Sequence, residues 1–309
     1  MMFALREIVI SLTFFVLFYC CFSMTVLVGW RALKRLRISD KSLANLLFLA
    51  RVLPMLASLA ITCVFVVPSF QLLEPRGTEE GTGILPVALG VAALFLIAFG
   101  CYRVFKAQTG TTRIVAEWLA KGQSRVAGAY TVCTRRDVPP LTLVGLLNPR
   151  VLVSDLTLRL LTENEMRIAL RHESAHMCFR DNFKKLILRF CPFPGMTPLE
   201  TAWAETAELA ADHAAVSTVD DAVELASALV KLSRLLPIQS APLCTVGFII
   251  GSVGTRVARL LEWNEAKEYG SPLPRWASIS VLIALALALV PTYGPALVIA
   301  HNVTEWLVR

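Results

Sequence analysis

Long apolar stretches without any charged residue alternate with shorter charged segments along this chain. Four stretches contain no Asp, Glu, Lys or Arg: residues 8–29, 52–73, 84–102 and 277–300. A helix of about 20 apolar residues is long enough to cross the hydrocarbon core of a bilayer. The pattern therefore predicts four transmembrane helices. A cleaved signal peptide is the alternative for the first stretch, but its apolar run is too long and a basic segment follows it.

The charges between the apolar stretches predict a multi-pass orientation in the cell membrane. Six basic residues and one acidic residue separate the first two stretches, whereas one basic and three acidic residues separate the second from the third. Cytoplasmic loops carry the excess of Lys and Arg. We therefore expect the first loop and the long segment after Tyr102 to be cytoplasmic, with both termini outside. That segment, residues 103–275, holds 21 basic and 17 acidic residues, so no direct nucleic-acid binding is expected.

The region between the third and fourth stretches has the size of one globular domain. Short apolar runs within residues 130–153 are cut by Pro and Gly, which predicts a small sheet, and helical patterns follow. The apolar run at residues 243–253 is too short to span a bilayer and belongs either to the core or to a contact with the membrane surface. We predict an α-helical membrane protein with three transmembrane helices in residues 1–106, a mainly helical, α+β cytoplasmic domain in residues 107–275, and a fourth transmembrane helix with a short tail in residues 276–309.

Two capping boxes predict where helices begin in this domain. In such a box a Thr hydroxyl accepts from a backbone N–H three residues later, and a Glu side chain reaches back to the first N–H. The pairs are Thr162 with Glu165 and Thr197 with Glu200. Helical spacing of apolar residues predicts that the first of these helices runs unbroken to Phe190.

Residues 172–176 read HESAH and lie in the middle of that first helix. His172 and His176 are four residues apart and therefore lie on one helix face. Both imidazoles can reach a single Zn²⁺, with Glu173 beside them as a general base. This spacing is the HExxH signature of zinc metallopeptidases. A catalytic zinc normally takes a third protein ligand and leaves a fourth position for water.

The second helix carries acidic residues on one stripe, which makes it the candidate source of the third ligand. The stripe consists of Glu205, Glu208 and Asp212. Such a stripe is usually only a solvated face, but an antiparallel helix pair would bring it opposite the two histidines. His213 is the competing third ligand, although it lies on a different part of the helix face. Asp181 either orients the zinc helix or is simply exposed.

The segments HESAHMCFRDN and AETAELAADHAAV resemble the BlaR/MecR-type membrane metallopeptidases, which are gluzincins like the HtpX and CAAX-processing peptidases. The similarity extends upstream through residues 138–170 and includes the membrane layout. It implies a gluzincin-like zinc peptidase domain inserted between the third and fourth transmembrane helices. It also implies that Glu208 is the third zinc ligand and that Asp212 accepts a hydrogen bond from a ligating imidazole.

The resemblance implies a membrane-anchored endopeptidase that cleaves a cytoplasmic protein in signal transduction, with a transcriptional repressor as the expected type of substrate. Antibiotic-sensing relatives carry a penicillin-binding sensor domain after the last span. Only nine residues, 301–309, follow that span here, so we do not expect a β-lactam sensor in this chain alone; the peptidase is expected to respond to another signal or to a separate sensor protein. Two alternatives remain open: a membrane quality-control peptidase of the HtpX type, and a non-catalytic signalling scaffold that keeps the motif only as structure.

Overall fold

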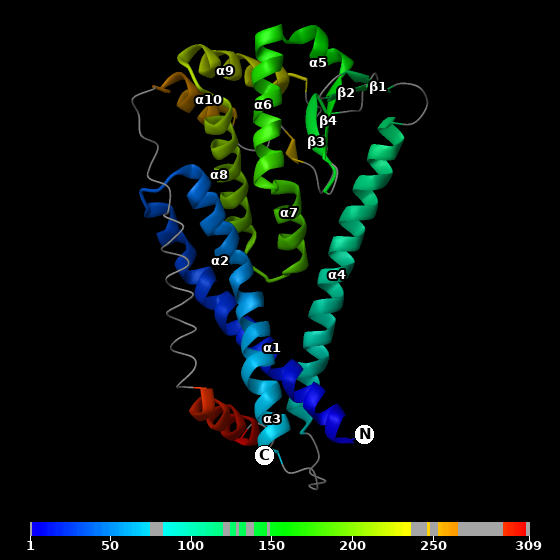
Figure 1. Ribbon diagram of the computed structural model, residues 1–309, viewed down its shortest axis with the longest axis vertical. Helices are drawn as coiled ribbons and strands as arrows, with labels where there is room; N and C mark the ends of the chain where they lie inside the picture. Colours follow the sequence, from blue (N-terminus) through cyan, green and yellow to red (C-terminus); the bar gives the residue numbers. More distant parts are fainter. Residues whose placement is uncertain are drawn as a thin grey trace.

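The structure is a computed structural model of a mainly helical protein with a small mixed sheet (Figure 1). It describes residues 2–74, 83–119, 124–127, 130–133, 139–146, 149–235, 246–247, 253–264 and 293–306. The long helices occupy one end of the molecule. The sheet and the helices within residues 155–179, 219–233 and 253–261 occupy the other end (Figure 1).

Three helical segments are long and apolar enough to cross a membrane: Phe3–Arg35, Asp40–Leu73 and Ile84–Leu119. They comprise α1 (Met2–Gly29), α2 (Asp40–Ile61) with its continuation α3 (Val67–Leu73), and α4 (Ile84–Leu119). The first three apolar stretches are thus helical, as predicted, and each lies in a helix long enough to cross a membrane. Residues 277–292 of the fourth predicted span lie outside the described residues, and residues 293–306 are helical.

The three long helices diverge toward the end that carries the smaller helices. α1 packs against both α2 and α4, with Phe15, Tyr19, Met55 and Ala93 in a shared apolar core. Toward the other end α4 leans away from α1 and α2, and α7 (Asp181–Phe190) and α8 (Thr197–Ala215) lie between them (Figure 1). We call residues 191–196, which connect these two helices, the docking turn.

The docking turn packs directly on the apolar helices. The Tyr19 hydroxyl, in the middle of α1, donates to the Pro192 carbonyl over 2.8 Å. The ring of Phe193 lies edge-on to the Tyr19 ring, with 5.7 Å between centroids. Cys191 and Met196 are buried at the two ends of the turn. The domain that carries the candidate site is therefore inserted between the spans and does not merely rest on them.

A small sheet lies beside the upper part of α4, as the short apolar runs predicted. Its strands are β1 (Ser124–Ala127), β2 (Tyr130–Cys133), β3 (Leu141–Val144), β4 (Arg150–Ser154) and β5 (Val246–Gly247), in the order β1-β2-β4-β3-β5. The β2–β4 pair is parallel and the other pairs are antiparallel. One face packs on Trp118 of α4, and the opposite face packs on α6 (Glu163–Phe179) and α9 (Val219–Ser233).

The remaining short helices are α5 (Asp155–Leu160) and α10 (Val253–Leu261).

The capping box at Thr162 is confirmed, since the Glu165 side chain accepts from the Thr162 backbone N–H. The prediction of a helix unbroken to Phe190 is wrong, because Arg180 adopts a left-handed conformation with φ 56° and separates α6 from α7. The second predicted capping box, with Thr197 and Glu200, is not formed. Met196 is the N-cap of α8, and Glu200 pairs with Arg51 of α2 at 2.9 Å.

At Gly100, α4 and α7 lie too close together to leave room for a side chain. A Cβ there would collide with the Phe190 backbone carbonyl, whereas Gly110 on the same helix has open space around its Cβ position. We expect Gly100→Ala to destabilise the protein by about 1–3 kcal/mol through overpacking. Gly110→Ala should stabilise it by up to about 1 kcal/mol through helix propensity. Thermal unfolding of the purified variants measures both effects, and equal melting temperatures would contradict this contact.

Candidate metal centre

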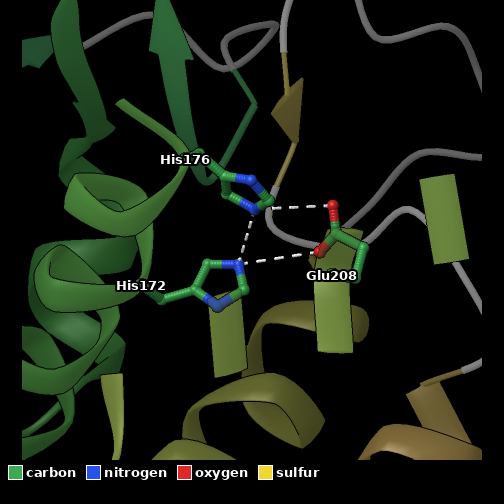
Figure 2. A group of neighbouring side chains, drawn as sticks. All are labelled: His172, His176 and Glu208. Carbon is green, nitrogen blue, oxygen red and sulfur yellow. Dashed lines mark hydrogen bonds and ion pairs between the residues drawn. The ribbon is translucent and has the colours of Figure 1, made fainter. Parts of the chain in front are cut away.

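The two histidines of the HESAH segment converge from one face of α6. Both side chains are fully buried, and their Nε2 atoms lie 3.1 Å apart (Figure 2). Zinc–nitrogen distances of about 2.1 Å in a tetrahedral site separate two ligand atoms by about 3.4 Å. The spacing of four residues therefore produces the pair of nitrogens that the sequence predicts.

Glu208 completes a buried group of three potential ligands. α8 runs alongside α6 in the opposite direction and brings this carboxylate against the imidazoles (Figures 1 and 2). Its Oε1 lies 3.5 Å from Nε2 of His176, and its Oε2 lies 3.6 Å from Nε2 of His172. The ligand atoms of the three residues all lie within 4.8 Å of one another. Two nitrogens and one carboxylate thus surround one point, with spacing compatible with an HExxH-type zinc site.

A second carboxylate lies behind each imidazole. Asp212 Oδ1 is 2.9 Å from Nδ1 of His172, and Asp181 Oδ2 is 2.8 Å from Nδ1 of His176. Such contacts fix the tautomer and ring orientation of a metal-ligating histidine. Both aspartates are buried. Asp181 is therefore not exposed, because the helix break at Arg180 brings this residue back toward His176.

Glu173 is buried beside the two histidines, and neither carboxylate oxygen has a hydrogen-bond partner among the described residues. Burial raises its pKa to about 6, although the nearby His176 and His172 act in the opposite direction. Buried carboxylate oxygens are nearly always satisfied by a partner. An unpartnered carboxylate next to two imidazole nitrogens and a glutamate therefore fits a site that binds a metal ion and its water.

Arg256 of α10 is a component of the site that sequence reasoning missed. Its side chain is 3 % exposed, its Nη1 donates to Glu208 Oε2 over 2.9 Å, and its Nε donates to Asp212 Oδ2 over 2.7 Å. Burial raises the pKa of both carboxyls, but the arginine and the histidines outweigh it and hold each pKa below its ordinary value. The sequence contains one indication of such a residue, because two buried carboxylates require a nearby cation. It does not identify which arginine of the chain supplies that cation.

Two residues of the predicted site region lie outside the buried group. Glu205 is exposed, and its carboxylate lies 4.0 Å from the Lys34 ammonium. His213 is also exposed, on a part of α8 that does not face the imidazoles. The acidic stripe is therefore divided: Glu208 and Asp212 face the site, while Glu205 faces solvent.

Comparisons with known proteins do not assign this chain to a family. It matches no protein-family model, and a search of curated proteins finds no significant relative. What is shown is a helical protein with three long apolar helices and a buried cluster of His172, His176 and Glu208.

Removal of the third ligand should abolish tight metal binding. We expect the purified protein to hold about one zinc ion per chain, and Glu208→Ala to weaken zinc affinity more than about 100-fold, because the loss of a direct ligand should exceed the effect of losing an outer partner. His213→Ala is the matched control on the same helix and should bind zinc like the wild type. Metal analysis and chelator competition measure both variants, and zinc loss only in His213→Ala would overturn the ligand assignment.

Protons should compete with the metal for this site. Burial alone lowers the pKa of His176, but the carboxylates of Glu208 and Asp181 outweigh it and raise the pKa to about 10. The imidazole of the metal-free site is therefore protonated at pH 7 and must lose this proton to bind a metal. We expect the zinc association constant to increase about tenfold from pH 7 to pH 8 and to fall below pH 7. A constant unchanged between these values in a competition titration would show that His176 is already neutral.

Proposed function

We propose that this protein is a membrane-anchored, zinc-dependent endopeptidase. One observation carries the proposal: two imidazole nitrogens and a Glu208 carboxylate converge within 4.8 Å, next to a buried Glu173 whose oxygens have no hydrogen-bond partner among the described residues. Borderline-soft Zn²⁺ binds this mixture of nitrogen and oxygen ligands. His172, His176 and Glu208 would hold the ion.

Zinc bound there would acidify a water molecule and polarise the scissile carbonyl of a peptide. Glu173 acts as the general base, because it is adjacent to the ligands without being one of them. It accepts a proton from the attacking water and returns it to the nitrogen of the leaving amine. A pKa of about 6 suits both steps, since the carboxylate is mostly ionised at neutral pH and its conjugate acid is still a useful donor.

Asp181 and Asp212 serve this reaction by holding the imidazoles. Asp181 accepts from Nδ1–H of His176, and Asp212 Oδ1 lies 2.9 Å from Nδ1 of His172. A proton held on Nδ1 leaves Nε2 available to the metal once the imidazole is neutral. Arg256 neutralises part of the negative charge that Glu208 and Asp212 bring into the interior. These contacts favour a rigid site in which the metal ligands are oriented before the metal arrives.

A groove beside His176 supports a polypeptide as the substrate. It has a volume of about 420 Å³, and its lining includes Leu143, Leu146, Met177 and Phe183. Phe183 is half exposed in this groove. An apolar recess next to a metal ligand can accept a large side chain of an extended chain segment. The proposed substrate is a cytoplasmic protein, with a transcriptional repressor as the specific candidate and a separate sensor protein as the source of the signal.

The arrangement of the spans supports a cytoplasmic site. The basic loop after α1 contacts the domain that carries the site: Lys34 lies 4.0 Å from Glu205 of α8, and Asp40 pairs with Arg259 of α10 at 2.8 Å. The loop and the site therefore lie on the same side of the spans. Because cytoplasmic loops are the basic ones, we propose that this side is the cytoplasm.

Replacement of Glu173 by Gln tests the catalytic proposal. The substitution keeps the shape of the side chain and all three proposed ligands but removes the base, and proton transfer of this kind is worth about 10²- to 10⁴-fold in rate. We expect Glu173→Gln to bind zinc like the wild type. The new protein N-termini that cleavage by the wild type creates in cells should be absent from cells that express Glu173→Gln. Mass spectrometry of N-terminal peptides from cells with equal expression of both proteins measures this.

Two outcomes would contradict the proposal. Equal cleavage by wild type and Glu173→Gln would show that Glu173 is dispensable. If the wild type holds zinc but produces no cleavage in this experiment, the chain is a non-catalytic scaffold.

A further inference from the structure

Arg51 is a buried arginine on α2 that the proposed chemistry does not use. Its side chain is 1 % exposed, and its Nε donates to Glu200 Oε1 over 2.9 Å. Its Nη2 donates to the backbone carbonyl of Cys191. Cys191 begins the docking turn and Glu200 lies in the first turn of α8, so one guanidinium contacts the segments on both sides of this turn.

These contacts resist any shift of α8 along α2. A buried charge that loses its partner is strongly destabilising, so the start of α8 cannot move away from Arg51 at low cost. Apolar packing acts in the same direction, because Leu47 and Val52 of α2 share a core with Leu199 and Trp203 of α8. The first half of α8 is therefore held by a membrane-spanning helix.

The metal ligands come from two differently supported helices. His172 and His176 lie on α6, whose apolar face packs on the sheet and α9. Glu208 lies on α8, eight residues after Glu200, which corresponds to about 12 Å along one rigid helix. α8 also packs directly on α6, so the distance between the carboxylate and the imidazoles depends on both contacts, and α2 is the helix that holds the first half of α8.

We propose that Arg51 is a positioning residue of the metal site: it acts through Glu200 and α8 to hold Glu208 at the distance from His172 and His176 that metal binding requires. The inference rests on the proposed zinc site and goes beyond it, since it makes coordination dependent on a transmembrane helix. A displacement of α2 relative to the sheet and α9 would withdraw Glu208 from the two histidines.

Zinc affinity of the full-length protein, purified in detergent, tests this role. We expect Arg51→Ala to weaken zinc binding about tenfold, the lower end of the effect of losing a group that contacts a metal ligand directly, because Arg51 acts on Glu208 only through Glu200 and α8. The matched control is Arg6→Ala, because Arg6 of α1 is also buried and pairs with Glu74 at 2.9 Å at the other end of the spans. This control should lose thermal stability but keep its zinc affinity within about twofold of the wild type, since Arg6 pairs with Glu74 at the opposite end of the long helices from the metal site.

Two further variants keep the test decisive. Glu200→Ala removes the partner at a position whose side chain is 30 % exposed; it should give the same loss of affinity if Arg51→Ala yields no folded protein. Arg51→Lys retains the positive charge opposite Glu200 but cannot also reach the Cys191 carbonyl as the guanidinium does, so its zinc affinity should lie between those of Arg51→Ala and the wild type.

The outcomes separate this inference from the proposed zinc site. If Glu208→Ala abolishes binding while Arg51→Ala and Glu200→Ala bind zinc like the wild type, the positioning role is wrong and the zinc site stands. An equal loss of affinity in Arg51→Ala and Arg6→Ala would also overturn it, because general destabilisation would then explain both. Absence of zinc from the wild type would overturn the metal site itself.

Discussion

The pairing of buried charges is the constraint on which the functional end of this molecule depends. Among the described residues, His172 and His176 lie against buried carboxylates that pair with these imidazoles or with the guanidinium of Arg256: Asp181, Glu208 and Asp212. Charges removed from water are tolerated only when they face opposite charges or hydrogen-bond donors. Because these residues come from α6, α7, α8 and α10, their pairing requires the four helices to meet at one place. Apolar packing brings the helices together, and the charges determine how each is rotated.

The same requirement explains how much of the protein could be predicted from its sequence. Features specified by neighbouring residues were predicted correctly: three apolar spans, the capping box at Thr162, and the common face of His172 and His176. Among features that depend on distant partners, the approach of Glu208 to the two histidines was expected from the resemblance to known metallopeptidases, and two others were not expected. Arg256 pairs with residues more than 40 positions earlier in the chain, and Glu200 bonds to Arg51 rather than completing a local cap. Local rules favour a nearby partner, and tertiary contacts override them.

The break at Arg180 shows how a local cost can be offset by a distant gain. A left-handed conformation is uncommon for a residue with a side chain, and nothing in the apolar spacing from α6 to α7 indicates it. The break redirects the chain so that Asp181 reaches Nδ1 of His176 and α7 runs toward the spans. Asn182 then donates to the carbonyls of Leu143 and Gly145, which ties the start of α7 to the end of β3. The conformation of Arg180 thus allows the two residues after it to contact the His176 imidazole and the sheet, and it directs α7 toward the long apolar helices.

The docking turn makes the part of this protein that carries the candidate metal site unsuitable for expression as a soluble fragment. Phe193, Leu199 and Trp203 pack on side chains of α1 and α2, and the carbonyls of Cys191 and Pro192 bond to Arg51 and Tyr19 of those helices. A truncated chain without the first three helices would present this apolar surface to water, and large exposed patches of this kind promote aggregation. Biochemical work on the site therefore needs the whole chain in detergent or lipid, and inhibitors screened against an excised domain would meet a differently shaped target.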